Sequence, residues 1–220
     1  MLNVAAMLSV IIRTKNGEPY LLDVLRPLVA AAADGAVRDV VFFDLGSRDG
    51  TAMIADAAGA IMVPVPKERE KATDLALKSA HRADWVLMLD QATVLTAGWL
   101  EEAMSFVERQ NRIRTPNRML SAAFRPEHEP ELGSADVKRR ASVVFANRVL
   151  SVGRLSQGLL ARRSHLRGAS APSIDWRAAD PAVKLPNLMR LRSCTHLAQP
   201  MEPLEEPENV ATGETVAETG

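Results

Sequence analysis

The sequence contains one cysteine, Cys194, among 220 residues, and aromatic side chains make up only 4% of it. A single cysteine excludes an internal disulfide framework and fits a reducing compartment. No stretch approaches the roughly 18 uninterrupted apolar residues of a membrane-spanning helix. The apolar N-terminus has its first basic residue, Arg13, after the apolar run, which is the wrong order for a signal peptide. These absences predict a cytoplasmic protein with no transmembrane segment.

Several common catalytic and binding motifs are also missing. The chain has no CxxC pair, no P-loop, no GxGxxG fingerprint and no nucleophile elbow. A nucleotidyltransferase on a related sheet would need a glycine- and lysine-rich phosphate loop, which the sequence lacks. Stacking aromatics do not accompany the arginines, so we do not expect a nucleic-acid partner.

Positive charge is absent from one end of the chain and concentrated before it. The last 28 residues hold six glutamates and no lysine or arginine. Residues 109–192 hold 17 basic against 6 acidic residues, whereas residues 1–108 hold 10 against 15. A basic second half can attract phosphates, anionic lipid headgroups or nucleic acid, or it can be a solvated surface. Residues 200–220 are acidic and polar, and we expect a disordered tail there.

Apolar runs alternate with amphipathic segments through the first half of the chain. Strands are predicted at Leu8–Thr14, Val37–Asp44, Ala60–Val65 and Trp85–Asp90, and helices at Pro19–Ala33, Thr51–Ala58, Arg69–Ala80 and from Trp99 onward. The continuous apolar run before Asp90 is typical of a strand buried on both faces. The alternation predicts an α/β fold with a mostly parallel sheet and helices on both faces.

The basic second half is less regular. Strands are predicted at Met119–Phe124, Ala141–Phe145 and Gly158–Arg162, with a short helix near Ser164–Leu166 and a largely irregular stretch over Ala169–Pro186. We therefore divide the chain into residues 1–108, residues 109–199 of the same domain, and the tail 200–220.

Two acids, Asp44 and Asp90, end predicted parallel strands. Ligands bind at the carboxyl ends of strands in open α/β sheets, and an unpaired buried charge is costly. Asp90 is therefore a candidate ligand for a metal or a nucleotide. The alternative is that it caps a turn, and Asp44 can likewise cap a turn through Asx-type bonds to the amides of the Gly46–Asp49 loop.

Three segments, LSVIIRTKNGEPYLLDVL, VVFFDLGSRDGT and ADWVLMLDQATVLTAGWL, occur in this order. Together they resemble the nucleotide-sugar-binding half of family 2 glycosyltransferases of the GT-A fold, over residues 7–107. The resemblance implies a GT-A-like (Rossmann-like) sheet and a nucleotide-sugar donor. It also implies a divalent cation, Mg or Mn, that neutralises the leaving diphosphate. Residues 1–108 would then bind the donor and residues 109–199 the acceptor.

The family motifs also imply roles for individual residues. Thr14, Asn16, Asp44 and Asp90 match donor-binding positions, and Asp90 is the metal ligand that remains of the family's DxD motif. Asp175 stands where the family places the acid that deprotonates the acceptor hydroxyl. The alternative for Asp175 is an exposed loop acid beside Trp176. The acceptor stays open: the basic second half suits an anionic or lipid-linked one, and a peripheral location on the inner face of the membrane.

Both acidic pairs of the family are broken in this chain. Leu45 replaces the second acid after the second strand, and Ala92 replaces the second carboxylate of DxD. Leucine cannot accept a hydrogen bond from a base, whereas one carboxylate can still hold Mg²⁺ together with phosphates and waters. The sequence therefore predicts a glycosyltransferase-like protein acting on a nucleotide-sugar donor and an unknown acceptor. The alternative is a non-catalytic pseudoenzyme of the GT-A fold that acts as a binding or scaffold subunit.

Overall fold

The computed structural model describes residues 7–113, 121–127, 152–167, 171–185 and 187–199. The strand predicted at 141–145 and the acidic tail predicted at 200–220 lie outside the described residues. The division of the domain at residue 108 stays a prediction.

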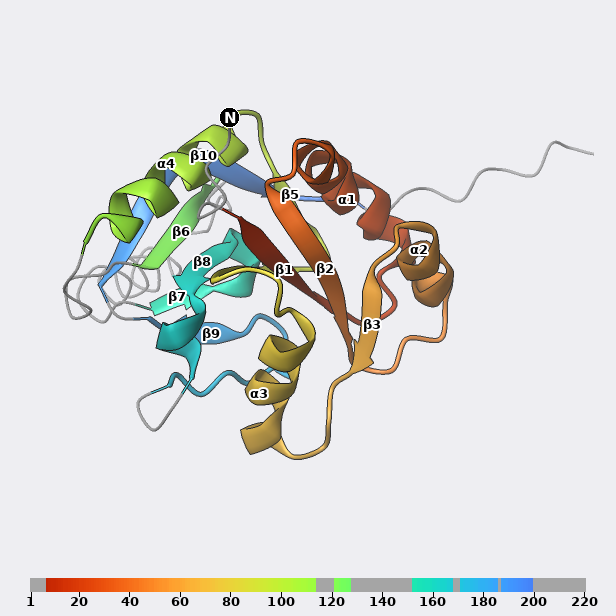
Figure 1. Ribbon diagram of the computed structural model, residues 1–220. Coiled ribbons are helices and arrows are strands. Elements are labelled where there is room, and N and C mark those ends of the chain that lie inside the picture. The colour runs from red at the N-terminus through yellow and green to blue at the C-terminus, as the bar shows by residue number, and fades with distance from the viewer. Residues whose placement is uncertain (1–6, 114–120, 128–151, 168–170, 186, 200–220) are drawn as a thin grey trace, which may run out of the picture.

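Strands and helices alternate through the first half (Figure 1). The order is β1 (Leu8–Thr14), α1 (Glu18–Ala33), β2 (Val37–Asp44), α2 (Thr51–Ala57), β3 (Ile61–Pro64), α3 (Arg69–Ser79), β4 (Trp85–Asp90), β5 (Thr93–Leu95) and α4 (Trp99–Asn111). The bounds of β1, β2 and β4 are those predicted, because each apolar run ends in a polar turn. Within the described residues, no helix combines the length and apolarity needed to cross a bilayer.

Three of the remaining strands, β6 (Ser121–Pro126), β8 (Leu159–Arg162) and β10 (Leu188–Leu197), extend the same sheet, and the other two, β7 (Val152–Arg154) and β9 (Ala182–Lys184), form a small sheet of their own. This half also contains the 3-10 turns η2 (Leu155–Gln157) and η3 (Arg163–Leu166). The main sheet has the order β3-β2-β1-β4-β8-β6-β10-β5, and β7 pairs with β9 separately. β1, β2, β3 and β4 pair in parallel, whereas β8 joins β4 and β6 in antiparallel fashion. The predicted α/β fold with a mostly parallel sheet is confirmed.

Two hydrophobic clusters lie on the two faces of the sheet. One gathers side chains from α1 and α4 against Val10, Ile12 and Leu89. The other gathers α3 and residues near Trp176 against Ile11, Val41 and Met88. Neighbouring residues of a strand therefore serve opposite clusters, as the alternation of side chains along a strand requires. Both faces are covered, so the ends of the strands are where polar groups can reach solvent.

The sequence did not predict β5, β7, β9 or β10. β10 carries Arg190, Arg192 and Thr195 between its apolar residues, and it has an irregular register against β6 between Arg190 and Cys194. Glu102 of α4 lies over this irregularity and accepts hydrogen bonds from the backbone N–H groups of Arg192 and Ser193, both at 2.5 Å. A side chain from another element thus completes the hydrogen bonding of the strand.

Candidate strand-end site

Asp44, the last residue of β2, organises the turn that follows it. Its Oδ2 accepts the N–H groups of Gly46 and Ser47 at 2.9 Å, and its Oδ1 accepts the hydroxyls of Thr14 at 3.2 Å and Ser47 at 2.5 Å. The residue is only 6% exposed. This is the arrangement expected of a turn cap. A donor-binding role for Asp44 stays a prediction.

The loop after β1 is hydrogen-bonded to the loop after β2. Asn16 adopts a left-handed backbone conformation with φ 51°. Its N–H donates to the Ser47 hydroxyl at 2.8 Å, and its side-chain oxygen accepts the N–H of Arg48 at 2.9 Å. Glu18, the first residue of α1, accepts the N–H of Gly50, just before α2, at 2.7 Å. The structure thus brings Thr14, Asn16 and Asp44 together through direct and shared partners, while their donor-binding role stays a prediction.

Asp90, at the end of β4, is paired with an arginine. The parallel register of β1 and β4 places Arg13 opposite Asp90, and Arg13 Nη1 forms a salt bridge with Asp90 Oδ2. The two side chains are 10% and 15% exposed. Burial raises the pKa of Asp90, Arg13 opposes that rise, and the charge of Asp180 adds to it. Asp90 is thus a partly buried acid held by one cation of the chain itself.

A segment from the second half crosses the ends of these strands; we call residues 174–178 the strap. Arg13 Nε donates to the carbonyl of Trp176 at 2.8 Å, and Arg13 Nη2 donates to that of Ala178 at 2.5 Å. The Trp176 ring is edge-on to Phe43 at 4.9 Å between centroids, and its Nε1 donates to Thr73 Oγ1 at 3.1 Å. The strap is therefore fixed to β1, β2 and α3 at once.

The predicted catalytic acid Asp175 lies within the strap. It is half-buried, and its Oδ1 accepts the backbone N–H of Arg177 at 3.2 Å. Arg177 itself donates to the carbonyl of Val65, just after β3, at 3.1 Å. Asp175 is thus placed near the strand ends, while its catalytic role stays a prediction.

Sequence reasoning missed a second acid on this side, Asp180. Its carboxylate binds Arg154 Nη1 at 3.2 Å, the hydroxyl of Ser156 at 3.0 Å and the N–H of Ser156 at 3.3 Å. Its charge is close enough to raise the pKa of Asp90. Asp175 and Asp180 belong to the same acid-containing segment, IDWRAADP. The sequence therefore offers either acid as a candidate for the catalytic base.

Leu45, at the position of one missing family acid, and Gln91, which lies between Asp90 and the other such position, Ala92, make other contacts. Leu45 is half-buried and packs against the cluster that contains Phe43, Val65 and Trp176. The side-chain oxygen of Gln91, next to Asp90, accepts the N–H of Lys15 at 2.6 Å. No group of three or more His, Cys, Asp or Glu side chains in the described part of the chain could hold a metal ion. The residues present therefore do not fit the carboxylate-rich site that a divalent cation prefers.

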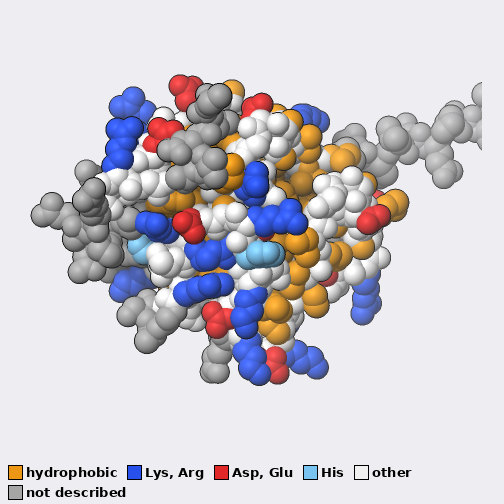
Figure 2. Space-filling view, in the orientation of Figure 1, with side chains coloured by type: hydrophobic (Ala, Val, Ile, Leu, Met, Phe, Trp, Pro, Cys, Tyr) orange, Lys and Arg blue, Asp and Glu red, His pale blue; other side chains and the backbone are white. Residues whose placement is uncertain are grey.

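Positive side chains gather over the middle of the face shown in Figure 2. Arg163, one of the basic residues of the second half, has partners within the chain: its guanidinium donates to the carbonyls of Leu77, Ala80 and Ala83. Those carbonyls lie at and just beyond the end of α3, where a cation is favoured by the helix dipole. Arg163 therefore stabilises a helix end.

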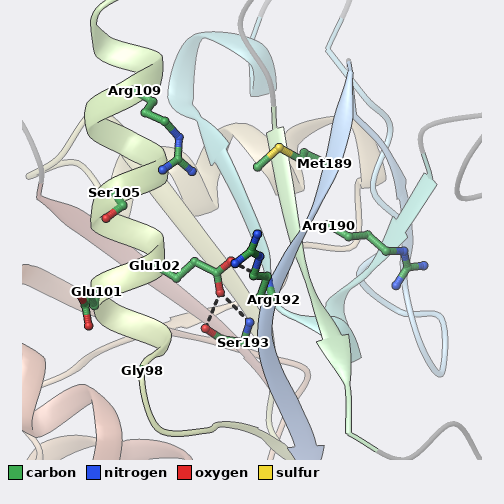
Figure 3. Close-up of a pocket in the computed structure, with 9 residues that line it drawn as sticks. All are labelled: Gly98, Glu101, Glu102, Ser105, Arg109, Met189, Arg190, Arg192 and Ser193. Atoms are coloured by element: carbon green, nitrogen blue, oxygen red, sulfur yellow. Dashed lines mark hydrogen bonds between the residues drawn. The ribbon is translucent and has the colours of Figure 1, made fainter.

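A pocket of about 800 Å³ lies between α4 and β10, away from the strand-end acids (Figure 3). Its lining includes Glu101, Ser105 and Arg109 of α4 and Arg192 and Ser193 of β10. Figure 3 shows Glu102 directed at Ser193, where it also accepts the hydroxyl hydrogen bond. The carboxylate of Glu102 therefore joins α4 to β10 at the wall of this pocket.

Comparison with known proteins places the chain in a family. The family model described as Glycosyl transferase family 2 matches residues 9–130, and no curated protein matches. Among solved structures, S. aureus TarS is 20% identical with a TM-score of 0.45, over 58% of this chain and 37% of that one. Glucosyl-3-phosphoglycerate synthase from Mycobacterium tuberculosis, solved with Mn²⁺, UDP-glucose and phosphoglyceric acid, is 21% identical with a TM-score of 0.47, over 73% and 57%.

A third solved structure carries the comparison of folds. It is described as a mycobacterial protein and is 20% identical with a TM-score of 0.55, over 92% of this chain and 72% of that one. The chain thus spans about a third of residues 1–349 of TarS, the part present in that structure, and most of the length of the mycobacterial protein. The family model covers more than half of the chain, in the order of strands and turns described above. The chain therefore belongs to glycosyl transferase family 2.

Proposed function

We propose that the chain binds a nucleoside diphosphate sugar at the carboxyl ends of β1, β2 and β4 and transfers the sugar to an acceptor. The observation that carries this proposal is the hydrogen-bonded cluster of Thr14, Asn16 and Asp44. These residues match the donor-binding positions of the family, and they meet where ligands bind in open α/β sheets.

The acceptor hydroxyl needs a base to take its proton. Asp175 is the predicted base, and Asp180 is the second candidate because its charge acts on Asp90. Replacing the base by asparagine should lower kcat by about 10²–10⁴-fold, since general base catalysis contributes on that order. Asp175→Asn and Asp180→Asn should therefore differ in kcat by a large factor. Wild-type activity in both variants would remove these acids from the mechanism.

The alternative function is a pseudoenzyme that binds without transferring. It is favoured by Leu45, which packs into a hydrophobic cluster at a position where the family has an acid. A binding subunit would retain affinity for a nucleoside diphosphate, yet it would release no sugar in the presence of acceptors.

The decisive experiment is a calorimetric screen of the full chain against uridine, guanosine, adenosine and cytidine diphosphates and their sugars. We expect one nucleotide class to bind, and we expect Asn16→Ala to weaken that binding about tenfold, the effect of losing about 1.4 kcal/mol of hydrogen bonding. Arg26→Ala is the matched control, because Arg26 forms a surface pair with Asp23 away from the cluster. Absence of binding to every nucleotide would overturn both functions, and sugar release separates the first from the second.

Three further parts of the proposal concern the surroundings of the reaction. An anionic or lipid-linked acceptor, and with it a peripheral place on the inner face of the membrane, would suit the basic second half. Co-sedimentation with anionic but not neutral vesicles tests this location. The third is the divalent cation, Mg or Mn, that the family resemblance implies; the residues present do not favour it, because it would have to compete with Arg13 for Asp90.

A further inference from the structure

We propose that Arg13 is the resident cation of the strand-end site and that Asp90 is not a metal ligand. A nucleoside diphosphate would then bind without a divalent ion. The part about the diphosphate rests on the proposed function, whereas the part about Asp90 does not.

The pairing of Arg13 with Asp90 is built into the register of the sheet. The two residues are opposite one another in parallel neighbours, and Ile11 and Met88, two residues before each, lie in the same hydrophobic cluster. Because side chains alternate along a strand, Arg13 and Asp90 face the same side. Their approach therefore requires no unusual loop conformation.

The guanidinium is held in place by three different partners. Nη1 binds Asp90, Nε binds the carbonyl of Trp176 and Nη2 binds that of Ala178. Since arginine has five N–H donors in a fixed plane, three bonds in three directions determine its orientation. The strap acceptors are themselves fixed, because the Trp176 ring is buried against Phe43. Arg13 cannot swing away from Asp90 without giving up both carbonyl bonds.

The charges around this pair disfavour a divalent cation. A metal bound to Asp90 would lie beside a guanidinium that stays protonated under all ordinary conditions, in a region where low solvent exposure strengthens repulsion. The neighbouring Gln91 oxygen is occupied by Lys15 N–H. Asp180, the other acid whose charge acts on Asp90, is bound by Arg154 and Ser156. The ligands that a metal would need are thus already committed to groups of the chain.

Arg13 supplies the charge that a metal would otherwise supply. A guanidinium is a strong partner for phosphate oxygens as well as for carboxylates, and this one lies at the strand ends beside the Thr14 cluster. The role of Arg13 toward a bound diphosphate is therefore to offset the negative charge of the phosphate groups.

The first test uses Mn²⁺ alone with the full chain, following the signal of free Mn²⁺ by electron paramagnetic resonance. We expect wild type and Asp90→Asn to bind Mn²⁺ equally weakly. Arg13→Ala should bind it about tenfold more tightly, because the substitution removes a positive charge that repels the metal ion beside the carboxylate, and Arg13→Ala/Asp90→Asn should lose that gain. Arg26→Ala, which removes a surface arginine, should match wild type. Mn²⁺ binding to wild type that Asp90→Asn abolishes would overturn the proposal.

The comparison of wild type with Asp90→Asn decides the point even if Arg13→Ala fails to fold. The second test measures binding of the nucleoside diphosphate by calorimetry in EDTA and in Mn²⁺. Equal affinity in the two buffers supports the proposal, and binding only in Mn²⁺ overturns it. No binding in either buffer would refute the proposed function and the role toward a diphosphate, while the Mn²⁺ titration still decides whether Asp90 is a metal ligand.

Discussion

Asp44 and Asp90 both end parallel strands of one sheet, yet they are satisfied in different ways. Asp44 is bound by neutral donors, three of which belong to Gly46 and Ser47 of the same turn. Asp90 is bound by a charged side chain 77 positions away in the sequence, and that side chain is bound by carbonyls about twice as far away. The first acid shapes its own loop, whereas the second depends on the assembled fold.

The difference shows how two acids at equivalent places acquire different chemistry. An acid that accepts several N–H and O–H groups is fixed by its turn and stays in place when distant parts of the protein change. An acid held by a buried arginine can be released or neutralised by a single substitution on another strand. Stability measurements on matched variants test this difference between the two acids.

The largest effect should come from Arg13→Ala. Removing the arginine leaves Asp90 as an uncompensated, partly buried charge and frees the carbonyls of Trp176 and Ala178, so the free energy of unfolding should fall by about 3 kcal/mol. Urea denaturation of Arg13→Ala, Asp90→Asn and the double variant gives the coupling energy, which should be about 1–3 kcal/mol for residues in contact. Additive effects of the two substitutions would contradict the pairing.

Asp44→Ala should be next. It leaves the N–H groups of Gly46 and Ser47 without their acceptor at a buried position, and unfolding should become easier by about 2 kcal/mol. Asp44→Asn keeps one acceptor oxygen and should lose about half as much. Urea denaturation measures both. If asparagine were as damaging as alanine, charge rather than hydrogen bonding would be what holds the turn.

Glu102 is an intermediate case, because it accepts backbone N–H groups like Asp44 but does so across 90 positions of sequence. Partial burial acts to raise its pKa, but the bonds from Ser193 and Arg192 outweigh this and lower the pKa below its usual value. The stabilisation is therefore complete above pH 4.5, the ordinary value, and is lost as the pH falls through the lowered pKa. Glu102→Gln should cost about 1 kcal/mol at neutral pH.

The measurement for Glu102 is urea denaturation of wild type and Glu102→Gln across acidic pH. The difference between them should shrink as the pH falls, because protonated Glu102 resembles glutamine. Glu101, in the same first turn of α4, provides the control: Glu101→Gln should not reproduce the pH-dependent difference. A gap that stayed constant with pH would show that the charge of Glu102 contributes nothing.

The smallest effect should come from Arg26→Ala. Arg26 pairs with Asp23 at 3.1 Å, but the side chains are 79% and 39% exposed. Exposed pairs contribute about 0–1 kcal/mol, so thermal unfolding should change little. A loss as large as that of Arg13→Ala would show that burial does not distinguish the two arginines.

Much of the first half was predictable because its strands are strongly apolar and end in polar turns. β1 and β4 are buried along nearly their whole length, and such runs have few alternatives. β10 was not predictable in this way, since Arg190 and Arg192 alternate with Met189 and Leu191 in a strand that is buried only in part. Where its register is irregular, the N–H groups of the strand donate to Glu102 of α4 instead. No local sequence pattern indicates this contact between distant residues.

The candidate site was predictable in its strand ends but not in its partners. Asp44 and Asp90 stand where the sequence placed them, whereas the arginine that neutralises Asp90 was overlooked. A signal was present: Arg13 is the sixth residue of β1 and Asp90 the sixth of β4, so two parallel neighbours in simple register bring opposite charges together. Asp180 and Arg154 carried no such signal, because their meeting depends on the pairing of β7 with β9.

The position of β8 has a consequence for how the protein is made. β4 pairs with β1 on one side and with β8 on the other, yet β8 follows it by about 70 residues. In a nascent chain that has left the ribosome only as far as α4, β4 is therefore an unpaired edge strand of the sheet. Such an edge can pair with strands of other chains. A recombinant fragment ending at residue 108 would keep β4 as an unpaired edge. The later residues, added as a separate chain, would supply β8 to pair with it.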